Sequence, residues 1–442
     1  MARWLLKFIV LVALGAGFFH IAFRDAPDDF DVTAGRNELL AATMPSHAGQ
    51  PQIRVLVADA LDIATLALDG MVRMEGVIHP NMTRRAGEFA QSVAVDIAPA
   101  PNGNGVNIGA DRYVRARIRP LGASPIKLSW RSGNQDVNLS LPYEIEIYAI
   151  HVRSGDTLTP KIRILARLPL EEYLYGVVAS EVPTSWPLEA LRSQAVASRT
   201  YAYFEIRSRR NEEYDVHAGT RSQVWRPATF VEPPVRRAVD STQGIVITEK
   251  NALIKTFFHS ECGGFTADAR WVFTKTPILA LSGVRCPRCA NQANRPTSWS
   301  VAYSRQEIAA RLGKAGLFKQ GGEIRNLQAL DQDGNPMGRR LGRAVTIEIT
   351  LAGGSGTTIR IPANEFRLAM GADRNNLAST YMTIEGGSEA RIAFSGLGWG
   401  HGVGLCQHGA AFAADRLGYS FMDILALYYP GSKLVRLWGA GQ

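Results

Sequence analysis

The stretch from residue 394 to 413, FSGLGWGHGVGLCQHGAAFA, combines residue types that could do chemistry: six glycines, two histidines and one cysteine. Such a stretch could cradle a phosphate, hold a metal ion, present a Cys/His nucleophile pair, or turn a strand into a helix. Its glycines recur mostly at every second position, without the G-x-G-x-x-G or G-x-x-x-x-G-K-[ST] spacing of nucleotide-binding loops. The G-x-S-x-G elbow of serine hydrolases is also missing.

Cys406 within this stretch is a candidate thiol nucleophile, with His401 or His408 as its base. Members of a catalytic triad are brought together in space rather than by sequence spacing, so the position of Cys406 five residues after His401 does not exclude this pair. Cys406 could instead bind a metal ion or form a disulfide bond together with the other cysteines of the chain. A thiol hydrolase is therefore one of the functions that the sequence leaves open.

A second candidate for chemistry is Glu181, which follows the apolar run YGVVAS and precedes Val182 and Pro183. A carboxylate at the end of a buried segment tends to have a raised pKa, as a general acid for a glycosidic bond requires. The alternative is a solvated loop glutamate or a partner of a helix N-terminus. Gln194 and Arg199 on the next predicted helix could reach this carboxylate, or could instead lie on a surface face of that helix.

The four cysteines all lie in the C-terminal half. His259 and Cys262 are separated by two residues, as are Cys286 and Cys289, and this is the spacing of zinc-knuckle half-sites; Cys406 is a further candidate ligand. Disulfide bonds are the default in an exported protein. Zinc, disulfides and free thiols are the three alternatives.

The elements that must position these residues indicate an α+β fold in which strands outnumber helices. Alternating and β-branched runs predict a β-rich N-terminal domain over 51–160. Residues 184–210 predict a helix with Pro187 in its first turn and Ser185 or Thr184 as possible caps. Residues 344–366 predict a hairpin, and 419–431 a helix with a capping box from Ser420 to Asp423.

The N-terminus predicts export. Arg3 and Lys7 precede an apolar run, so residues 1–23 are expected to be a signal peptide or a membrane anchor. Residues 24–50 are expected to be a linker, and 433–442 a tail. The net charge of +9 favours an anionic partner such as a membrane surface or a wall polymer. It does not predict a nucleic-acid partner, because the chain has no long Lys/Arg run.

Four blocks, in order, resemble the SpoIID/LytB family, the stage II sporulation protein D and amidase-enhancer group. They are EEYLYGVVASEVPTSWPLEALRSQAVASRTYAY, DVHAGTRSQVW, FHSECGGFTADARWVF and GLGWGHGVGLCQHGAAFAA. The resemblance covers roughly residues 160–432. It implies a SpoIID-like catalytic domain over 161–432, with a β-rich insertion at about 300–390.

The resemblance further implies a lytic transglycosylase that cleaves peptidoglycan glycan strands, with stem-peptide-free strands preferred by sporulation members. The family's catalytic glutamate falls on Glu181. It would protonate the glycosidic oxygen and then take the proton of the muramic acid C6 hydroxyl, leaving a 1,6-anhydro end. The candidate substrate-binding residues are Gln194, Arg199, Ser260, His401 and Gln407. The alternative is a non-catalytic enhancer that binds a wall amidase or the glycan. For either function we expect the protein to act outside the cytoplasm, in the periplasm, in the cell wall or at the cytoplasmic membrane.

Some members of the family carry zinc on His and Cys, with His259 in a matching position, whereas the other cysteines of this chain do not match that arrangement. Because all four cysteines lie in or near the resembling blocks, we expect one shared cluster holding a structural zinc, with His259 as an alternative ligand. The expected cluster is Cys262, Cys286, Cys289 and Cys406. The glycine-rich stretch would then form the far wall of a glycan groove opposite Glu181, with Cys406 as its anchor.

Overall fold

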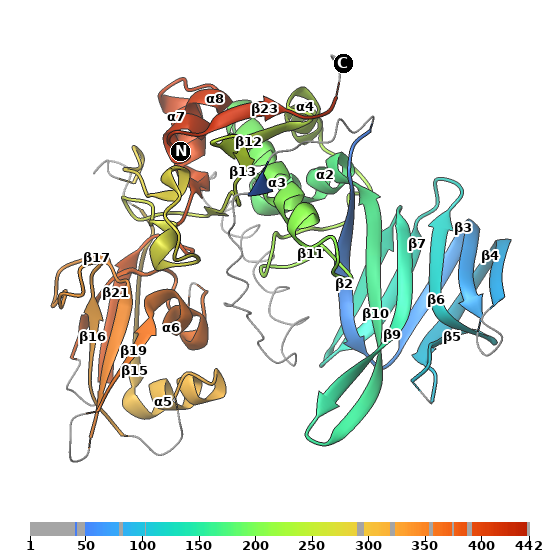
Figure 1. Ribbon diagram of the computed structural model, residues 1–442, viewed down its shortest axis with the longest axis horizontal. Coiled ribbons are helices and arrows are strands. Elements are labelled where there is room, and N and C mark those ends of the chain that lie inside the picture. Colours follow the sequence, from blue (N-terminus) through green and yellow to red (C-terminus); the bar gives the residue numbers. More distant parts are fainter. Residues whose placement is uncertain are drawn as a thin grey trace, which may run out of the picture. The chain divides into compact units, whose positions relative to one another are not determined.

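The computed structural model describes two compact units (Figure 1). Unit 1 comprises residues 51–180 and 209–231, and unit 2 comprises 181–208, 232–439 and the short strand 40–41. The predicted export segment 1–23, and the linker apart from 40–41 and 49–50, lie outside the described residues. Among the residues described, no helix is long and apolar enough to cross a membrane. The described residues are 40–41, 49–78, 83–101, 103–289, 296–318, 323–352, 357–373, 375–386 and 391–439.

Unit 1 is built on one ten-stranded sheet, in the order β11-β2-β10-β9-β6-β5-β4-β3-β7-β8. The sheet curls because β3 also pairs with β6, so that β3, β4, β5 and β6 form a closed ring of pairings. The strands are β2 (Gln52–Leu61), β3 (Ala64–Ile78), β4 (Thr83–Pro99), β5 (Val106–Ile108), β6 (Asp111–Pro120), β7 (Ile126–Ser132), β8 (Gln135–Leu141), β9 (Glu144–Ser154), β10 (Thr157–Pro169) and β11 (Val216–His217).

Buried β-branched side chains hold this sheet. Ile145 and Ile147 of β9 are fully buried and stand opposite Ile118 and Ala116 of β6. The predicted domain boundary at residue 160 falls inside β10, which pairs with β9 and β2 along its length. The sheet therefore continues to Pro169. The hydrogen bonds of β10 to its two neighbouring strands extend past residue 160, where only the amino-acid composition changes.

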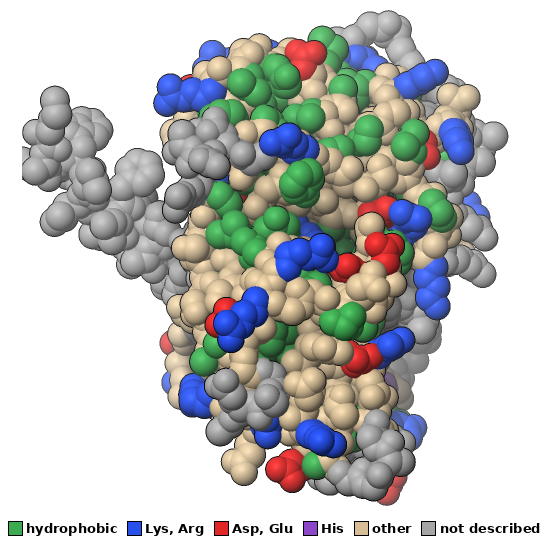
Figure 2. Space-filling view, turned by 90° about the vertical axis from the view of Figure 1, so that its left-hand side faces the viewer, with side chains coloured by type: hydrophobic (Ala, Val, Ile, Leu, Met, Phe, Trp, Pro, Cys, Tyr) green, Lys and Arg blue, Asp and Glu red, His purple; other side chains and the backbone are tan. Residues whose placement is uncertain are grey.

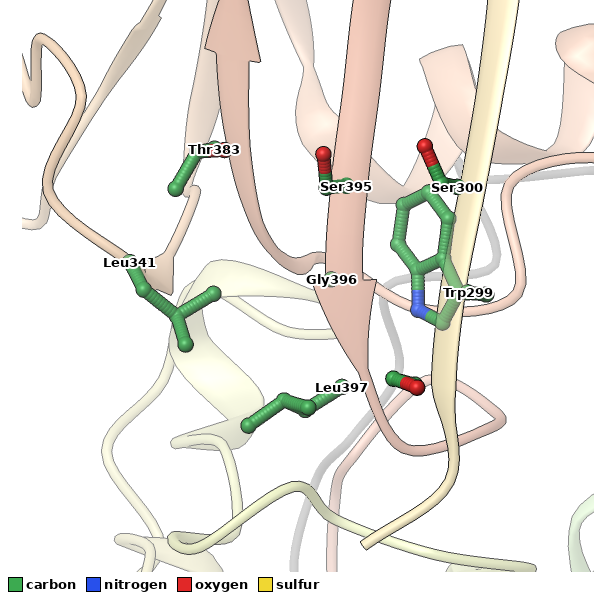
Figure 3. A pocket seen from close by; sticks show the side chains of 8 residues that line it. Trp299, Ser300, Leu341, Thr383, Ser395, Gly396 and Leu397 are labelled. Atoms are coloured by element: carbon green, nitrogen blue, oxygen red, sulfur yellow. The ribbon is translucent and has the colours of Figure 1, made fainter.

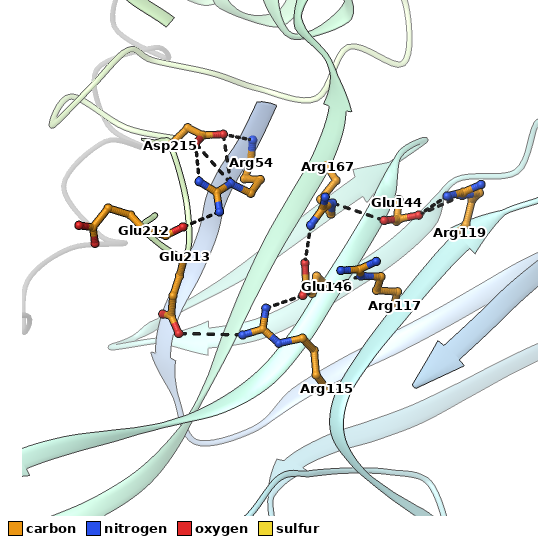
Figure 4. Close-up of polar contacts among 10 residues, drawn as sticks. All are labelled: Arg54, Arg115, Arg117, Arg119, Glu144, Glu146, Arg167, Glu212, Glu213 and Asp215. Atoms are coloured by element: carbon orange, nitrogen blue, oxygen red, sulfur yellow. Dashed lines mark hydrogen bonds and ion pairs between the residues drawn. The ribbon is translucent and has the colours of Figure 1, made fainter. Parts of the chain in front are cut away.

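A buried carboxylate organises the charged side chains on the same sheet (Figure 4). Glu146 of β9 is 1% exposed, and it accepts hydrogen bonds from Arg115 of β6 at 2.6 Å and from Arg167 of β10 at 3.0 Å. Burial alone would raise the pKa of Glu146, but the two arginines lower it overall. This ion pair links three neighbouring strands.

Unit 2 is centred on the long helix α3 (Leu188–Ser208). The predicted helix is confirmed: it begins directly after Pro187, whose carbonyl accepts from Leu191 N at 3.1 Å. Its small residues allow close packing, and Ala195, Ser198 and Ala202 are fully buried. The other helices of unit 2 are α4 (Pro233–Ser241), η1 (Ala269–Trp271), η2 (Leu279–Leu281), α5 (Arg305–Lys314), α6 (Ala363–Met370), α7 (Gln407–Arg416) and α8 (Phe421–Tyr428), and α2 (Leu170–Glu181) joins the two units.

Four small sheets complete unit 2, with the orders β1-β13-β12-β23, β14-β22, β15-β21-β20-β17 and β16-β18-β19. The last two, with α5 and α6, enclose their own apolar core between Ser298 and Leu397. Their strands are β1 (Leu40–Ala41), β12 (Ile245–Glu249), β13 (Ala252–Leu253), β14 (Phe258–His259), β15 (Ser298–Ser304), β16 (Ile324–Leu330), β17 (Gly342–Arg343), β18 (Thr346–Leu351), β19 (Thr358–Pro362), β20 (Tyr381–Glu385), β21 (Arg391–Leu397), β22 (Leu405–Cys406) and β23 (Lys433–Arg436).

Two further local predictions in unit 2 are confirmed, and so is the α+β fold class. Strands β18 and β19 pair antiparallel, as expected for the hairpin at 344–366. Helix α8 begins with the predicted capping box, in which Ser420 accepts from Asp423 N and Asp423 accepts from Ser420 N.

On the face drawn in Figure 2, Lys and Arg side chains stand apart and are interspersed with acidic and apolar ones.

The Glu146 ion pair predicts a local loss of stability when its charge is removed. Glu146→Gln should destabilise unit 1 by about 2–3 kcal/mol at neutral pH, because it leaves two arginines beside a buried neutral amide. Because the pKa is lowered in the folded state, this stabilisation exists above the ordinary glutamate pKa and is lost as the pH falls below it. Urea unfolding followed by hydrogen exchange of β9 peptides would measure both effects.

The matched control is Glu88→Gln. Glu88 pairs with Arg73 on the exposed part of the same sheet, and both side chains are nearly half exposed. This substitution should change the stability by less than about 1 kcal/mol. Equal effects of the two substitutions would contradict the structural role of Glu146.

Candidate active site

Glu181 is the last residue of α2 and is half-buried. The loop that follows it is held at two points. Trp186 N donates to Pro183 O at 3.1 Å, and the Thr184 hydroxyl donates to Glu232 Oε2 at 2.5 Å. The carboxylate therefore sits at a helix end whose exit is fixed.

Gln407 joins Glu181 to helix α3. Its side-chain nitrogen Nε2 lies 3.4 Å from Glu181 Oε2 and 3.4 Å from Gln194 Oε1. Gln194 Nε2 in turn donates to the Ser198 hydroxyl at 3.0 Å. Both amides are almost fully buried. Because the two N–H groups of Gln407 are directed at two fixed acceptors, this chain of amides orients one side of the Glu181 carboxylate.

Gln407 reaches this position because it is the first residue of α7, where the strand β22 turns into a helix. The parallel pair β14–β22 sets Cys406 opposite His259, and His408 N donates to Ser260 O at 3.1 Å. Ser260 thus contacts α7 through its backbone. The rings of His408 and Trp186 meet edge to face, 5.1 Å apart, so the loop after Glu181 is held against α7 at a second point.

The glycines before α7 serve the packing of the protein itself. Gly404 has a φ of +72°, and a Cβ there would lie 2.0 Å from Phe257 O. This packing by itself explains the glycine, without reference to the glycan groove expected for the stretch. His401 in the same stretch points into the protein: its ring lies 4.9 Å from that of Phe273, and Nδ1 accepts from Val403 N at 3.1 Å. Among the described residues, His401 makes no hydrogen bond to Glu181.

His259 is a buried neutral imidazole. Its Nδ1 donates to the Val403 carbonyl at 3.1 Å, which leaves Nε2 as a buried lone pair without a hydrogen-bond partner among the described residues. Burial, followed by the charge of Arg343, lowers the pKa of His259 to about 3. It does not belong to the group of sulfur ligands described below.

Arg199 is fully buried and lies on another side of α3 from Gln194, because five helical residues turn the side-chain direction by about 140°. Its guanidinium donates to Val239 O, to Ile245 O and to the Thr242 hydroxyl, at 3.2–3.4 Å. These contacts tie α3 to the end of α4 and the start of β12. Arg199 thus has a structural function that the sequence pattern did not suggest.

The four cysteines converge, although three separate segments carry them. Their sulfur atoms all lie within 4.8 Å of one another, the side chains are buried, and none forms a disulfide bond. Two groups donate to the sulfurs: Gly264 N to Cys262 at 3.4 Å and Arg288 Nη1 to Cys289 at 3.8 Å. The Tyr428 hydroxyl lies 3.3 Å from the Cys286 sulfur, and either of these two groups can be the donor. The Cys406 sulfur lies 3.9 Å from Ser260 O.

This donor set fits a zinc ion. Tetrahedral coordination with Zn–S bonds of about 2.3 Å separates the sulfurs by about 3.8 Å, so the cluster would have to contract by no more than about 1 Å. Hydrogen bonds to thiolate sulfurs are typical of such centres. Four protein ligands leave no open position for substrate, which agrees with a structural site.

Three residues of the site escaped the sequence reasoning: Trp186, Ser198 and Glu232. Trp186 stands in the loop directly after Glu181, and that position was a usable signal. Ser198 lies within the predicted helix, one turn after Gln194. Glu232 carries no local signal, because only the tertiary structure brings it to Thr184.

Two hollows on unit 2 lie outside this site. One, of about 440 Å³, is lined by Trp299, Leu341, Leu397 and hydroxyl side chains of the insertion (Figure 3), and the indole of Trp299 lies over Gly396. None of its lining residues is ionisable, so it offers no acid or base. The other, of about 650 Å³, is lined by mixed charges that include the ion pairs Arg270–Asp268 and Arg340–Asp331.

Together these features define a two-unit α+β protein with a half-buried carboxylate held by glutamine side chains, beside a four-cysteine cluster. The SpoIID family, described as stage II sporulation protein, matches residues 159–248. An uncharacterised protein of Brachyspira hyodysenteriae is 30% identical over 279 residues, which cover 62% of this chain and 68% of that protein. The chain belongs to the SpoIID family.

Two relatives from Bacillus subtilis have descriptive names. The amidase enhancer is 29% identical over 59% of this chain, and the match covers 40% of the enhancer's own length. The stage II sporulation protein D is 28% identical over 60% of this chain and 74% of that protein. The match thus spans less than half of the enhancer and about three quarters of the sporulation protein.

The close contact of α7 with the cysteine cluster predicts a steric effect at Gly409. A Cβ at this position would lie 2.0 Å from the Tyr428 hydroxyl and 2.7 Å from the Cys286 sulfur. Gly409→Ala should destabilise unit 2 by about 1–3 kcal/mol, measured by chemical unfolding. Gly313→Ala is the matched control in helix α5, where the added methyl has room and should stabilise by up to about 1 kcal/mol.

Proposed function

We propose that this protein acts on the cell wall as a lytic transglycosylase that cleaves peptidoglycan glycan strands, with Glu181 as its general acid and base. The observation that carries the proposal is the contact of Gln407 with both Glu181 and Gln194, which gives the carboxylate a fixed orientation. Membership in the SpoIID family supports a role in the cell wall, outside the cytoplasm.

In the proposed reaction, Glu181 in its acid form protonates the glycosidic oxygen, and the bond from that oxygen to the muramic acid C1 breaks. The resulting carboxylate then takes the proton of the C6 hydroxyl while this oxygen attacks C1. The product is a 1,6-anhydromuramyl end, and Glu181 returns to its acid form. A single carboxylate suffices because the substrate supplies the attacking hydroxyl, whereas a hydrolytic glycosidase uses a second carboxylate.

The structure supports different roles for the predicted substrate-binding residues. Gln407 and Gln194 contact the carboxylate or each other, so they are proposed to orient it. Ser260 contacts the first turn of α7, and a role of its hydroxyl in binding sugar remains a proposal. His401 and Arg199 hold the protein's own backbone and are proposed to support the site from behind.

A second candidate function is a non-catalytic enhancer that binds a wall amidase or the glycan. The name of the 29%-identical Bacillus subtilis relative favours it. In that case Glu181 would be a structural residue, and the partner would be a protein or an intact glycan strand. A membrane attachment through residues 1–23 fits either function.

The cleavage assay distinguishes the two functions. Purified protein incubated with stem-free glycan strands should release anhydro-ended fragments, detected by mass spectrometry. Glu181→Gln should lower this activity at least about 1000-fold, because an amide can neither donate nor take the proton. The control is Glu172→Gln in the same helix, where the side chain is exposed and the activity should be unchanged.

Absence of anhydro products from the wild-type protein, together with stimulation of a wall amidase, would favour the enhancer. Inhibition of cleavage by a thiol-blocking reagent, even with zinc present, would point instead to Cys406 as a nucleophile.

The hydrogen bond from Gln407 to Glu181 predicts a smaller loss of activity on substitution of Gln407 than on substitution of Glu181. Gln407→Met keeps the side-chain volume but removes both N–H groups, so Glu181 loses a hydrogen bond. The kcat for glycan cleavage should fall about 10–100-fold, the cost of a hydrogen bond to a charged group, while KM changes little. Steady-state kinetics with purified variants would measure this. A large rise in KM with unchanged kcat would mean that Gln407 binds substrate instead of orienting Glu181.

A further inference from the structure

The loop directly after Glu181 is a tight turn with little conformational freedom. Trp186 N donates to Pro183 O at 3.1 Å, and such a turn brings the Cα atoms of these two residues within about 7 Å of each other. Pro187 follows Trp186, and the residue before a proline is restricted to extended backbone conformations. The turn therefore holds the Trp186 side chain at a fixed position close to the end of α2.

The first turn of α7 contacts both the carboxylate and the indole. Gln407 Nε2 lies 3.4 Å from Glu181 Oε2, and the ring of His408, the next residue, lies 5.1 Å from the ring of Trp186. The two ring planes meet at 63°, and an edge-to-face contact of this kind occupies at most one face of the indole. The indole and the proposed general acid are thus held by adjacent residues of one helix turn.

Trp186 also offers a hydrogen-bond donor. Its side chain is half-buried, and its indole nitrogen Nε1 has no acceptor in the part of the chain that the structure describes. Nε1 is not one of the buried atoms without a partner, so it is open to solvent. Trp299, which lines the hollow of Figure 3, differs in both respects: it is 8% exposed, and its Nε1 donates to the Ser379 hydroxyl at 3.3 Å.

The chemistry of a pyranose ring matches that of this indole. The C–H groups of the sugar form an apolar face that can stack on an aromatic ring, and its hydroxyl and N-acetyl oxygens accept hydrogen bonds. A tryptophan with an apolar body and an accessible N–H provides both kinds of contact at once. The position of Trp186 beside a carboxylate places such contacts where a glycosidic bond would be cleaved.

We propose that Trp186 is a substrate-binding residue, and that its indole is the stacking platform for the N-acetylhexosamine ring next to the cleaved bond. His408 fixes the indole in this role through the edge-to-face contact. The inference rests on the function proposed above, because it takes the glycan strand as the ligand. It assigns sugar binding to Trp186, whereas Gln407 and Gln194 orient the carboxylate.

The first experiment is steady-state kinetics on stem-free glycan strands. Trp186→Ala should raise KM about 10–100-fold, because it removes the apolar contact with one sugar face. The kcat should change less than about threefold, as expected for a contact made equally in the ground state and the transition state. Trp186→Phe should restore much of the affinity, because it keeps an aromatic face and loses only the N–H.

The matched control is Trp271→Ala. Trp271 is also half-buried in unit 2, but it lines the charged hollow outside the site, so its removal should leave KM unchanged. A fall in kcat with unchanged KM in Trp186→Ala would overturn the proposal, because Trp186 would then only hold the loop that carries Glu181.

The second experiment measures binding without cleavage and keeps Trp186 intact, so it also applies if Trp186→Ala fails to fold. Incorporation of 5-fluorotryptophan gives each of the eight tryptophans a fluorine resonance. In full-length Glu181→Gln, added stem-free glycan should shift the Trp186 resonance and leave that of Trp271 in place. Single Trp→Phe substitutions assign both signals. An unmoved Trp186 resonance at the highest soluble glycan concentration would refute the proposal.

The two experiments distinguish this inference from the proposed function. Cleavage with an unchanged KM in Trp186→Ala refutes the platform and leaves the lytic reaction standing. A shifted Trp186 resonance without anhydro products from the wild type supports the platform and refutes the lytic reaction. Absence of both the shift and the cleavage refutes both.

Discussion

The adjacency of Cys406 and Gln407 is the constraint on which the centre of unit 2 depends. One residue contributes a sulfur to the buried cluster, and the next presents its amide to Glu181 at 3.4 Å. Because consecutive residues at a helix start have little freedom relative to each other, fixing the sulfur also fixes the amide. Gly409 completes the arrangement by letting α7 approach Cys286 and Tyr428. The same few residues thus serve the packing of the helix and the orientation of the carboxylate.

Buried polar groups shape both units, in different ways. In unit 1, Glu146 is paired with arginines from two neighbouring strands, so its buried negative charge is compensated within the sheet. In unit 2, Arg199 satisfies its donors on carbonyl and hydroxyl oxygens, and thereby ties α3 to α4 and β12. Arg343 and Arg367 also bond uncharged backbone carbonyl groups. Each pattern follows from the cost of leaving a buried charge or donor without a partner.

The site combines features of an enzyme with features of a scaffold. A half-buried carboxylate at a fixed helix end, oriented by an amide chain, is suited to proton transfer. In the glycine-rich stretch, in contrast, Gly404 is needed for the close packing of the backbone against Phe257, and His401 faces Phe273. The main function of this stretch, for which a groove wall was inferred, is therefore to support the structure around the site. Trp186 and His408 contact each other and join the loop after Glu181 to α7.

The sequence by itself determined the α+β class, helix α3 after Pro187, the β18–β19 hairpin and the capping box of α8, because these depend on local periodicity and hydrogen bonding. It also singled out Glu181, Gln194 and Gln407, and the four cysteines as a group. Tertiary structure alone decided that Gln407 bridges two segments and that Arg199 is internal. It also decided that the sulfurs converge without His259, and that β10 extends the sheet to Pro169. Contacts between residues far apart in the chain depend on packing, which local sequence patterns do not encode.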